Sequence, residues 1–312
     1  MRTKSSATHS VSAPLSGSER QGILWGLLGV AAFSLTVPLT RAAVEYDGLP
    51  PLFVGAARAV LAGALALMVL LMLRQRIPSP RLWPRIAVVA GGVVVGFPML
   101  TSYSLTTSSA GHAAVIIALL PATTAMVAVI RTGEGPPRAF WVATALGALA
   151  AGAFAAVHGG GFSSFGWPDA LLLAAVVAGA FGYAEGGLLA RELGAWQTIC
   201  WALVMSLPVM ALLTAVSVSA ESPRAEPHQW LAFLYLGIIS MFLGFFAWYR
   251  GLGIGPVSRV SQIQLIQPVM SLCWAALLLG ERITWLTLLG GAAVLLCAVA
   301  AVRIRIQPAS RK

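Results

Sequence analysis

The chain alternates between long apolar runs and short clusters of charged or polar residues. Residues 21–40 contain no Asp, Glu, Lys or Arg, residues 51–73 contain only Arg58, and residues 86–130 are uncharged throughout. A membrane-spanning helix needs about 20 mostly apolar residues, so the longest run is long enough for two. The pattern predicts ten spans, at residues 21–40, 51–73, two within 86–130, 139–157, 169–189, 196–218, 229–249, 260–280 and 284–302.

Polar and glycine-rich segments mark where the chain turns between these spans. The sequence TTSSAGH at residues 106–112 divides the long uncharged run into two helices. HGGGFSSFGWP closes the fifth span, and RGLGIGPVSR is rich in Gly and Pro, which favours a tight connection between the eighth and ninth spans. The expected fold class is an all-α polytopic membrane protein.

Composition supports the membrane class. Of the 312 residues, 58% are hydrophobic and 10% are charged, whereas a soluble domain carries roughly 25% charged residues. The three cysteines show no metal-ligand spacing, so neither a disulfide framework nor a zinc site is expected, and no cofactor is predicted. A net charge of +10 suggests nucleic acid in a soluble protein, but here it indicates cationic cytoplasmic loops and no nucleic-acid partner.

Basic residues are distributed unequally between the two sides of the membrane. With the N-terminus inside, the cytoplasmic segments hold sixteen of the twenty Lys and Arg residues, namely Arg2, Lys4, Arg20, Arg74, Arg76, Arg81, Arg85, Arg131, Arg138, Arg191, Arg250, Arg259, Arg303, Arg305, Arg311 and Lys312. The outer segments hold Arg41, Arg224 and Arg282. This asymmetry predicts cytoplasmic N- and C-termini. The polar, Ser-rich start of the chain lacks the apolar core of a signal peptide.

Two stretches, residues 119–134 and 266–281, repeat the same pattern. Each runs from a proline through an apolar run to Gly-Glu, and a shift of 147 residues matches Pro121 with Pro268 and Glu134 with Glu281. Each half then holds five spans, and because five is odd the second half must enter the membrane from the opposite side. Inverted repeats of this kind are common in secondary transporters, with a substrate site between the halves near the midplane.

The second half resembles an EamA domain of the drug/metabolite transporter superfamily. The resemblance rests on Trp248-Tyr249 before a Gly-rich turn, a polar run to Pro268, then Gly280-Glu281-Arg282, and Gly290. The first half is similar more weakly, through Arg58, Pro121 and Gly133-Glu134. The resemblance extends over essentially the whole chain after residue 20.

This resemblance implies ten helices in two inverted EamA repeats and the export of small metabolites, amino acids or drugs. The expected domains are a disordered cytoplasmic tail at residues 1–20, a first repeat at 21–158, a second repeat at 168–303 and a basic cytoplasmic tail at 304–312.

Glu185 is the acidic residue that falls inside a predicted span. It lies about one to two turns from the cytoplasmic end of that span. A carboxylate there is costly unless it is paired, protonated or in water, and one that exchanges a proton would suit proton coupling. The alternative is a structural hydrogen bond, or a carboxylate that reaches the interface.

Arg58 lies about two turns into the second span from the outside. Its planar guanidinium offers two parallel donors that suit a substrate carboxylate. The alternative is an ion pair at the outer mouth, with Glu45 or Asp47.

The ninth span carries a polar stripe. Ser261, Gln264, Gln267 and Ser271 recur at helical spacing and share one face. Amides that face lipid are unfavourable, so this face is expected to point inward, either toward substrate or into hydrogen bonds with other helices. The matching positions of the fourth span are Ala114, Ile117, Leu120 and Thr124, so the repeat is chemically lopsided.

The repeated prolines and glutamates have different expected roles. Pro121 and Pro268 each remove a backbone donor and are expected to kink their helices, as hinges or as plain kinks. Glu134 and Glu281 fall at helix ends, where capping or pairing with Arg138 or Arg282 is expected. They are markers of the repeat.

Four further side chains are candidates for the substrate or proton pathway. His112 can relay protons, or it can be a capping or loop histidine beside SSAG. Tyr103, Tyr183 and Trp248 can stack on an aromatic substrate, although interfacial or core packing explains most Tyr and Trp side chains in membrane proteins.

The chain contains none of the motifs GxxxxGK[ST], HExxH or GxSxG, so neither ATP hydrolysis nor intramembrane hydrolysis is expected and the protein is not predicted to be an enzyme. It is interpreted as a secondary transporter in the bacterial inner membrane, monomeric or homodimeric. It is expected to export a small organic solute, neutral or zwitterionic, by alternating access, with proton coupling as one mechanism. The competing interpretations are a lipid flippase of the same superfamily and a non-transporting scaffold or sensor.

Overall fold

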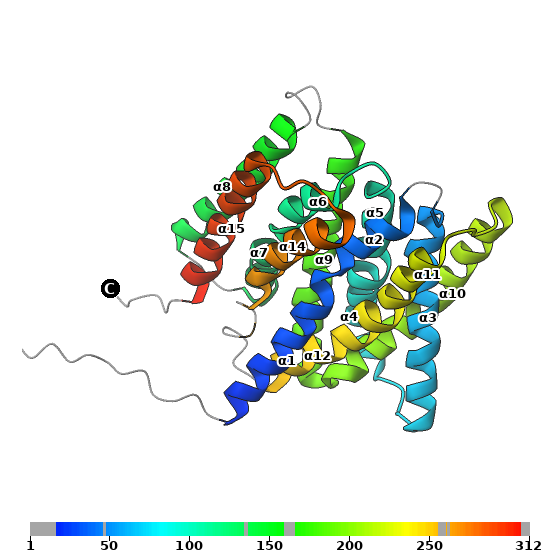
Figure 1. Ribbon diagram of the computed structural model, residues 1–312. Helices are drawn as coiled ribbons and strands as arrows, with labels where there is room; N and C mark the ends of the chain where they lie inside the picture. The colour runs from blue at the N-terminus through cyan, green and yellow to red at the C-terminus, as the bar shows by residue number, and fades with distance from the viewer. Residues whose placement is uncertain are drawn as a thin grey trace, which may run out of the picture.

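The computed structural model describes residues 17–45, 48–133, 137–158, 166–254, 260 and 263–306. Every regular element in these ranges is a helix (Figure 1). Lipid offers no hydrogen-bond partners to the backbone, so an apolar run of this length adopts the structure that satisfies its own N–H and C=O groups.

The helices follow the order of the apolar runs. They are α1 Gly17–Ser34, α2 Thr36–Val44, α3 Pro51–Met72, α4 Trp83–Val89, α5 Phe97–Ser104, α6 Ala110–Ile117, α7 Leu120–Thr132, α8 Arg138–His158, α9 Trp167–Glu192, α10 Ala195–Ala220, α11 Pro227–Leu234, α12 Gly244–Ile254, α14 Gln267–Leu279 and α15 Trp285–Ile306. Short 3-10 turns, Pro80–Leu82 and Gln264–Ile266, precede α4 and α14.

Eight helical segments are long and apolar enough to cross a bilayer, namely Arg20–Val44, Pro51–Met72, Pro80–Ser104, Ala110–Thr132, Trp167–Glu192, Ala195–Ala220, Pro227–Ile254 and Trp285–Ile304. Two further apolar stretches, Arg138–Ala151 and Gln264–Leu279, are shorter. The prediction of an all-α, polytopic chain is confirmed over the described residues, and the count of ten spans stays a prediction.

The first span is broken at Leu35, although the sequence suggested one continuous helix. Pro38 has no N–H to donate to the carbonyl four residues earlier, which belongs to Ser34. The hydroxyl of Ser271 in α14 donates to this carbonyl at 2.8 Å. A helix of the second half thus replaces the backbone bond that the proline removes.

Helices of the two halves pack against each other in pairs. α1 lies against α12, α3 against α10, and α8 against α15, the last pair side by side at the upper left of Figure 1. Glycines bring the α1 and α12 backbones together, because a Cβ added at Gly29 would lie 2.9 Å from the nitrogen of Trp248. A Cβ added at Gly251 would lie 2.8 Å from the nitrogen of Gly26. Small residues at such positions permit close helix packing.

The repeated stretch forms the same local structure twice. α7 and α14 each have 13 residues, with the repeated proline in the first turn. Proline is tolerated there because the N–H of that position has no helical partner. Each helix ends at a glycine in the left-handed region, Gly133 with φ 71° and Gly280 with φ 64°. A side chain is disfavoured in that conformation, which explains why glycine stands at both positions.

A second pair of elements also coincides under the 147-residue shift. π-helical turns occur at Ala90–Gly96, between α4 and α5, and at Tyr235–Leu243, between α11 and α12. Shifting residues 90–96 by 147 gives 237–243, inside the second π-helical segment. Such turns are rare and are frequently found at functional sites.

Candidate substrate cavity and helix-end contacts

Two adjoining cavities lie between the halves of the chain and share Val37 and Gln267 in their walls. Seven of the residues singled out from the sequence line one or both cavities: Arg58, Pro121, Tyr183, Gln264, Gln267, Pro268 and Ser271. The first turns of α2, α7 and α14 line these cavities. The fold therefore gathers polar and proline residues from distant parts of the chain around one space.

The cavities are narrow in this conformation. Their volumes are about 30 Å³ for the one beside Arg58 and about 10 Å³ for the one between the two prolines. A cavity needs roughly 10–15 Å³ to hold a water molecule, so an organic solute does not fit in either. The surrounding helices must separate before a solute can enter.

Arg58 is the buried cation of the larger cavity, with 1% of its surface exposed. Its NH1 donates to the hydroxyl of Thr40 at 3.4 Å, and its NH2 donates to the hydroxyls of Thr101 and Ser102, each at 3.5 Å. These bonds are long, since N–H···O distances normally lie near 2.9–3.0 Å. Its Nε has no partner among the described residues. The guanidinium is thus held by hydroxyl groups and incompletely satisfied.

The ion pair expected at the outer mouth is formed by a different arginine. Glu45 binds Arg41, one turn away on α2, with an N–O distance of 2.5 Å. Asp47, the other expected partner of Arg58, lies outside the described residues. No ion pair joins Arg58 to a carboxylate within the described part of the chain.

Aromatic side chains form one wall of the larger cavity. The rings of Phe33 and Phe245 lie 4.8 Å apart, and the ring of Tyr183 lies 5.8 Å from that of Phe245 in a stacked arrangement. Trp248 packs edge-on against Tyr183 at 6.2 Å, behind this wall. Tyr183 thus lines the cavity, while Trp248 supports it without lining either cavity.

The polar stripe of the ninth span points inward as expected. Gln264, Gln267 and Ser271 are 3%, 7% and 4% exposed. Gln264 Nε2 and Gln267 Oε1 have no partner among the described residues, whereas Ser271 is bonded to Ser34. Ser261 lies outside the described residues. One atom of each amide is therefore available to bind a solute or water, while Ser271 joins helices.

Glu185 belongs to an ion-pair network at the opposite side of α9 from the cavity-lining Tyr183. Arg85 Nε donates to one of its carboxylate oxygens, and Arg131 Nε donates to the other at 2.7 Å. Arg85 NH1 also donates to Glu192 at 2.6 Å. The network joins α4, α7 and α9, and the Glu185 side chain is 5% exposed. The carboxylate is thus paired on both oxygens.

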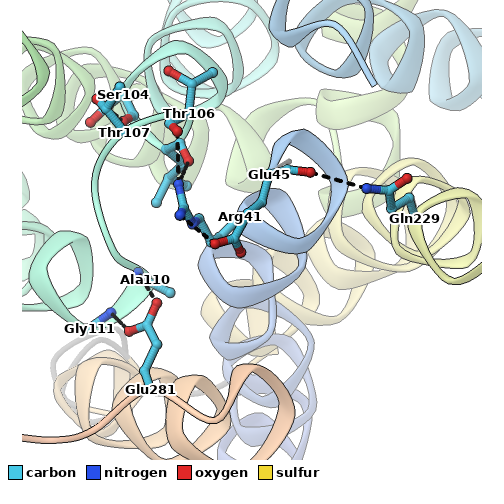
Figure 2. A network of polar contacts seen from close by, with 10 residues as sticks. Arg41, Glu45, Ser104, Thr106, Thr107, Ala110, Gly111, Gln229 and Glu281 are labelled. Atoms are coloured by element: carbon cyan, nitrogen blue, oxygen red, sulfur yellow. Dashed lines mark hydrogen bonds and ion pairs between the residues drawn. The ribbon is translucent and has the colours of Figure 1, made fainter. Parts of the chain in front are cut away.

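A second set of polar contacts joins other helix ends, as Figure 2 shows. Arg41 donates to the carbonyls of Leu105 and Thr106 at 2.8 and 2.9 Å, just after α5. Glu281 accepts hydrogen bonds from the backbone N–H groups of Ala110 and Gly111 at 2.7 and 2.8 Å (Figure 2). These groups start α6, where unpaired N–H groups and the helix dipole favour a negative charge. Glu281 therefore caps a helix of the other half.

The remaining candidates lie away from the cavities. His112 Nε2 is 2.6 Å from Asp169, at the start of α9, and the His112 ring stacks on Phe154. Tyr103 is 37% exposed and lines neither cavity. Glu134 lies outside the described residues.

Sequence reasoning missed several residues of these sites. It did not connect Arg85 and Arg131 with Glu185, although all three were placed near the cytoplasmic side, and that shared depth is the signal that could have joined them. Phe33, Thr36, Ser240 and Phe245 also line the larger cavity. Nothing in their spacing distinguishes them from ordinary helix-packing residues.

The chain is similar to known transporters. The model of the EamA-like transporter family matches twice, at residues 20–155 and 166–303. The chain is 42% identical over 283 residues to the uncharacterized transporter YdeK of Bacillus subtilis (strain 168), covering 90% of this chain and 97% of the relative. It is 28% identical over 285 residues to a probable terminal-alkyne amino-acid exporter of Streptantibioticus cattleyicolor, covering 86% and 89%.

A solved structure described as a crystal structure of a protein has a similar fold. The TM-score is 0.60 at 19% identity, with 92% of this chain and 98% of that chain covered. The apolar helices and the relatives together define a multi-pass membrane transporter. The chain belongs to the EamA-like transporter family. The predicted family resemblance is therefore confirmed.

Proposed function

We propose that this transporter exports a small organic solute, such as an amino acid, metabolite or drug, across the bacterial inner membrane by alternating access. The observation that carries the proposal is the cavity between the halves, where Arg58, Tyr183 and Gln267 converge from three distant segments. A mostly apolar lining with a few precisely placed polar groups is the usual lining of a small-molecule site. The relative named as an amino-acid exporter supports the direction and the substrate class.

The proposed architecture is ten spans in two inverted five-helix halves, with both termini in the cytoplasm. Support comes from the two matches of the family model and from the coincidence of α7 with α14 under the 147-residue shift. Two related halves can rock about a shared site and expose it to one side at a time.

The polar contacts at the helix ends are the proposed closures of the two sides. The Arg85–Glu185–Arg131 network closes the cytoplasmic side, and the contacts of Arg41 and Glu281 close the outer side. Each set of contacts joins different spans. The polar bonds on one side of the membrane must therefore break before the cavity can open to that side. The narrow cavities agree with a conformation closed at both ends.

This assignment changes the part proposed for Glu185. A carboxylate held by two arginines is stabilised in its ionised form, which suits a latch better than a proton carrier. Proton coupling through Glu185 would require the two arginines to leave before the proton binds. Its test is Glu185→Gln in proteoliposomes, where full transport driven by a pH gradient would contradict proton coupling at this residue.

One observation bears on the flippase alternative. An apolar groove of about 590 Å³ lies along α1, α3, α10 and α12, with Trp25, Trp196 and Arg250 in its wall. A flippase needs a lateral opening that leads to the transport path. Here the closely packed α1 and α12 separate the groove from the cavity, which favours a solute exporter over a flippase.

A transport screen tests the proposed function. Cells with and without the protein are compared for resistance to toxic amino-acid analogues and antibiotics, and for metabolites released to the medium. Val37→Trp fills the junction of the two cavities and is expected to abolish any effect. Leu277→Trp, on an exposed site of α14 (73% exposed), is the matched control and is expected to retain it. A protein that changes no resistance and releases no metabolite would be a scaffold or sensor.

A further inference from the structure

The charge of the larger cavity is unbalanced. Arg58 is a fully buried cation, and the described residues that line the cavity include no carboxylate. An arginine side chain stays protonated in proteins, so it cannot relieve the imbalance by losing its proton. Burying a charge is costly unless it is paired and hydrogen-bonded.

We propose that the transported solute is a monoanion: a carboxylate whose nitrogen, where present, is uncharged, as in an N-acylated amino acid. The proposal rests on the function proposed above and names the substrate class of the same cavity. It differs from the neutral or zwitterionic solute that the sequence suggests.

Arg58 is arranged to receive the carboxylate. Its Nε has no partner within the described ranges, and its NH1 and NH2 make hydrogen bonds to hydroxyls at 3.4–3.5 Å, so a carboxylate can replace weak bonds with strong ones. A guanidinium and a carboxylate form two parallel, charge-assisted bonds. The bound pair would have no net charge, and the closed cavity would no longer hold an uncompensated cation.

A zwitterion would not restore this balance. Its ammonium group would bring a second positive charge into a space that lacks a described carboxylate to receive it. Gln267 Oε1, for which the described residues offer no partner, can accept a hydrogen bond from an uncharged amide N–H without that electrostatic penalty. The unpartnered donor of Arg58 and the unpartnered acceptor of Gln267 therefore fit a carboxylate and a neutral N–H in one molecule.

The wall of the cavity sets the remainder of the solute. Phe33, Tyr183 and Phe245 form an aromatic surface beside Arg58. Apolar or aromatic side chains stack favourably on such a surface. An N-acylated aromatic amino acid combines all three recognised groups.

Four compounds that share one side chain test the inference on the full-length wild-type protein in detergent. At about pH 6, which keeps an α-amino group protonated, they are N-acetyl-L-phenylalanine (monoanion), L-phenylalanine (zwitterion), L-phenylalaninamide (cation) and N-acetyl-L-phenylalaninamide (neutral). Binding is measured as the shift in unfolding temperature across a concentration series. The monoanion is expected to bind at least about tenfold more tightly than each of the other three, as one or two charge-assisted hydrogen bonds imply.

Variants then locate the preference. Arg58→Gln is expected to remove it, leaving the acetylated acid and acetylated amide within about threefold of each other. Arg58→Lys keeps the charge without the planar fork and is expected to retain a reduced preference for the acid. Arg250→Gln removes an exposed arginine whose guanidinium lies 5.2 Å from the ring of Trp25, outside the cavity, and is expected to bind like the wild type.

Equal or tighter binding of the zwitterion to the wild type would overturn the inference, as would no binding of the monoanion. So would a preference for the acid that survives Arg58→Gln. The first two results are obtained with the wild type, and only the third requires the Arg58→Gln variant to fold. The function proposed above fails separately, when the screen finds no exported solute of any charge. Export of neutral compounds would leave that function standing and overturn the monoanion.

Discussion

α7 and α14 share a backbone but differ in every polar contact that they make. Both begin at a proline and both end after 13 residues at a left-handed glycine. Near its end α7 carries Arg131, which binds Glu185, whereas the matching residue of α14 is Leu278, 51% exposed. The duplication therefore kept the shape of the element and not its chemistry.

The same difference appears in the middle of the two helices. Ser271 of α14 donates to the carbonyl of Ser34, while the hydroxyl of the matching Thr124 of α7 has no hydrogen-bond partner among the described residues. Under the 147-residue shift, the amides Gln264 and Gln267 correspond to the apolar residues Ile117 and Leu120. One half thus supplies a polar surface, and the other supplies an apolar one to the same cavity. A repeated element can in this way form a site without internal symmetry.

The largest expected effect comes from removing the carboxylate of Glu185, to which Arg131 of α7 donates. Glu185→Gln leaves Arg85 with one ionic partner and Arg131 with none among the described residues. We expect a loss of about 2–3 kcal/mol, below the range for a fully buried pair because Arg131 is 52% exposed. The measurement is thermal unfolding in detergent.

The control for this change is Glu221→Gln, since Glu221 is exposed and follows α10. An unchanged unfolding temperature for Glu185→Gln would show that the Arg85–Glu185–Arg131 network does not stabilise the folded protein.

A smaller effect is expected at the matching end of α14. Glu281→Ala removes the carboxylate that accepts from Ala110 and Gly111. Loss of a side-chain cap costs about 1–2 kcal/mol. The unfolding temperature should fall, and amide exchange in the first turn of α6 should accelerate. Arg282→Ala, which removes the neighbouring exposed side chain, should change neither quantity.

The backbone similarity predicts equal effects at two positions. Gly133→Ala and Gly280→Ala each place a side chain at a positive φ, in open space. Each change is expected to cost about 1 kcal/mol, because only the backbone conformation opposes the added methyl group. Thermal unfolding of the two variants side by side tests this equality. A difference well beyond the error of the measurement would mean that the two helix ends are not equivalent.

The smallest effects are expected at a matched pair with different contacts. Ser271→Ala removes a hydrogen bond to a carbonyl that proline has already deprived of its helical partner, and it should cost about 1 kcal/mol. Thr124→Val removes a buried hydroxyl that has no partner in the described part of the chain, so stability should be unchanged or slightly higher. The reverse order of the two unfolding temperatures would contradict this account of the asymmetry.

The sequence by itself determined the class, the repeat and the approximate positions of the apolar helices. Hydropathy predicts the apolar helices because the bilayer leaves the backbone no alternative, and the prolines and glycines of residues 119–134 and 266–281 act through local backbone geometry. These features depend on residues close together in the chain, so pattern and spacing are sufficient to predict them.

Tertiary structure alone decided which polar groups have partners. Arg58, Glu185 and Gln267 are all buried polar residues in the sequence pattern, yet Glu185 is held by two arginines while the other two remain incompletely bonded. The Ser34 carbonyl that Pro38 leaves without a helical donor is likewise bonded by Ser271, more than 200 residues away. Whether a buried polar group is satisfied depends on which helices the fold brings together, because those partners lie far apart in the chain.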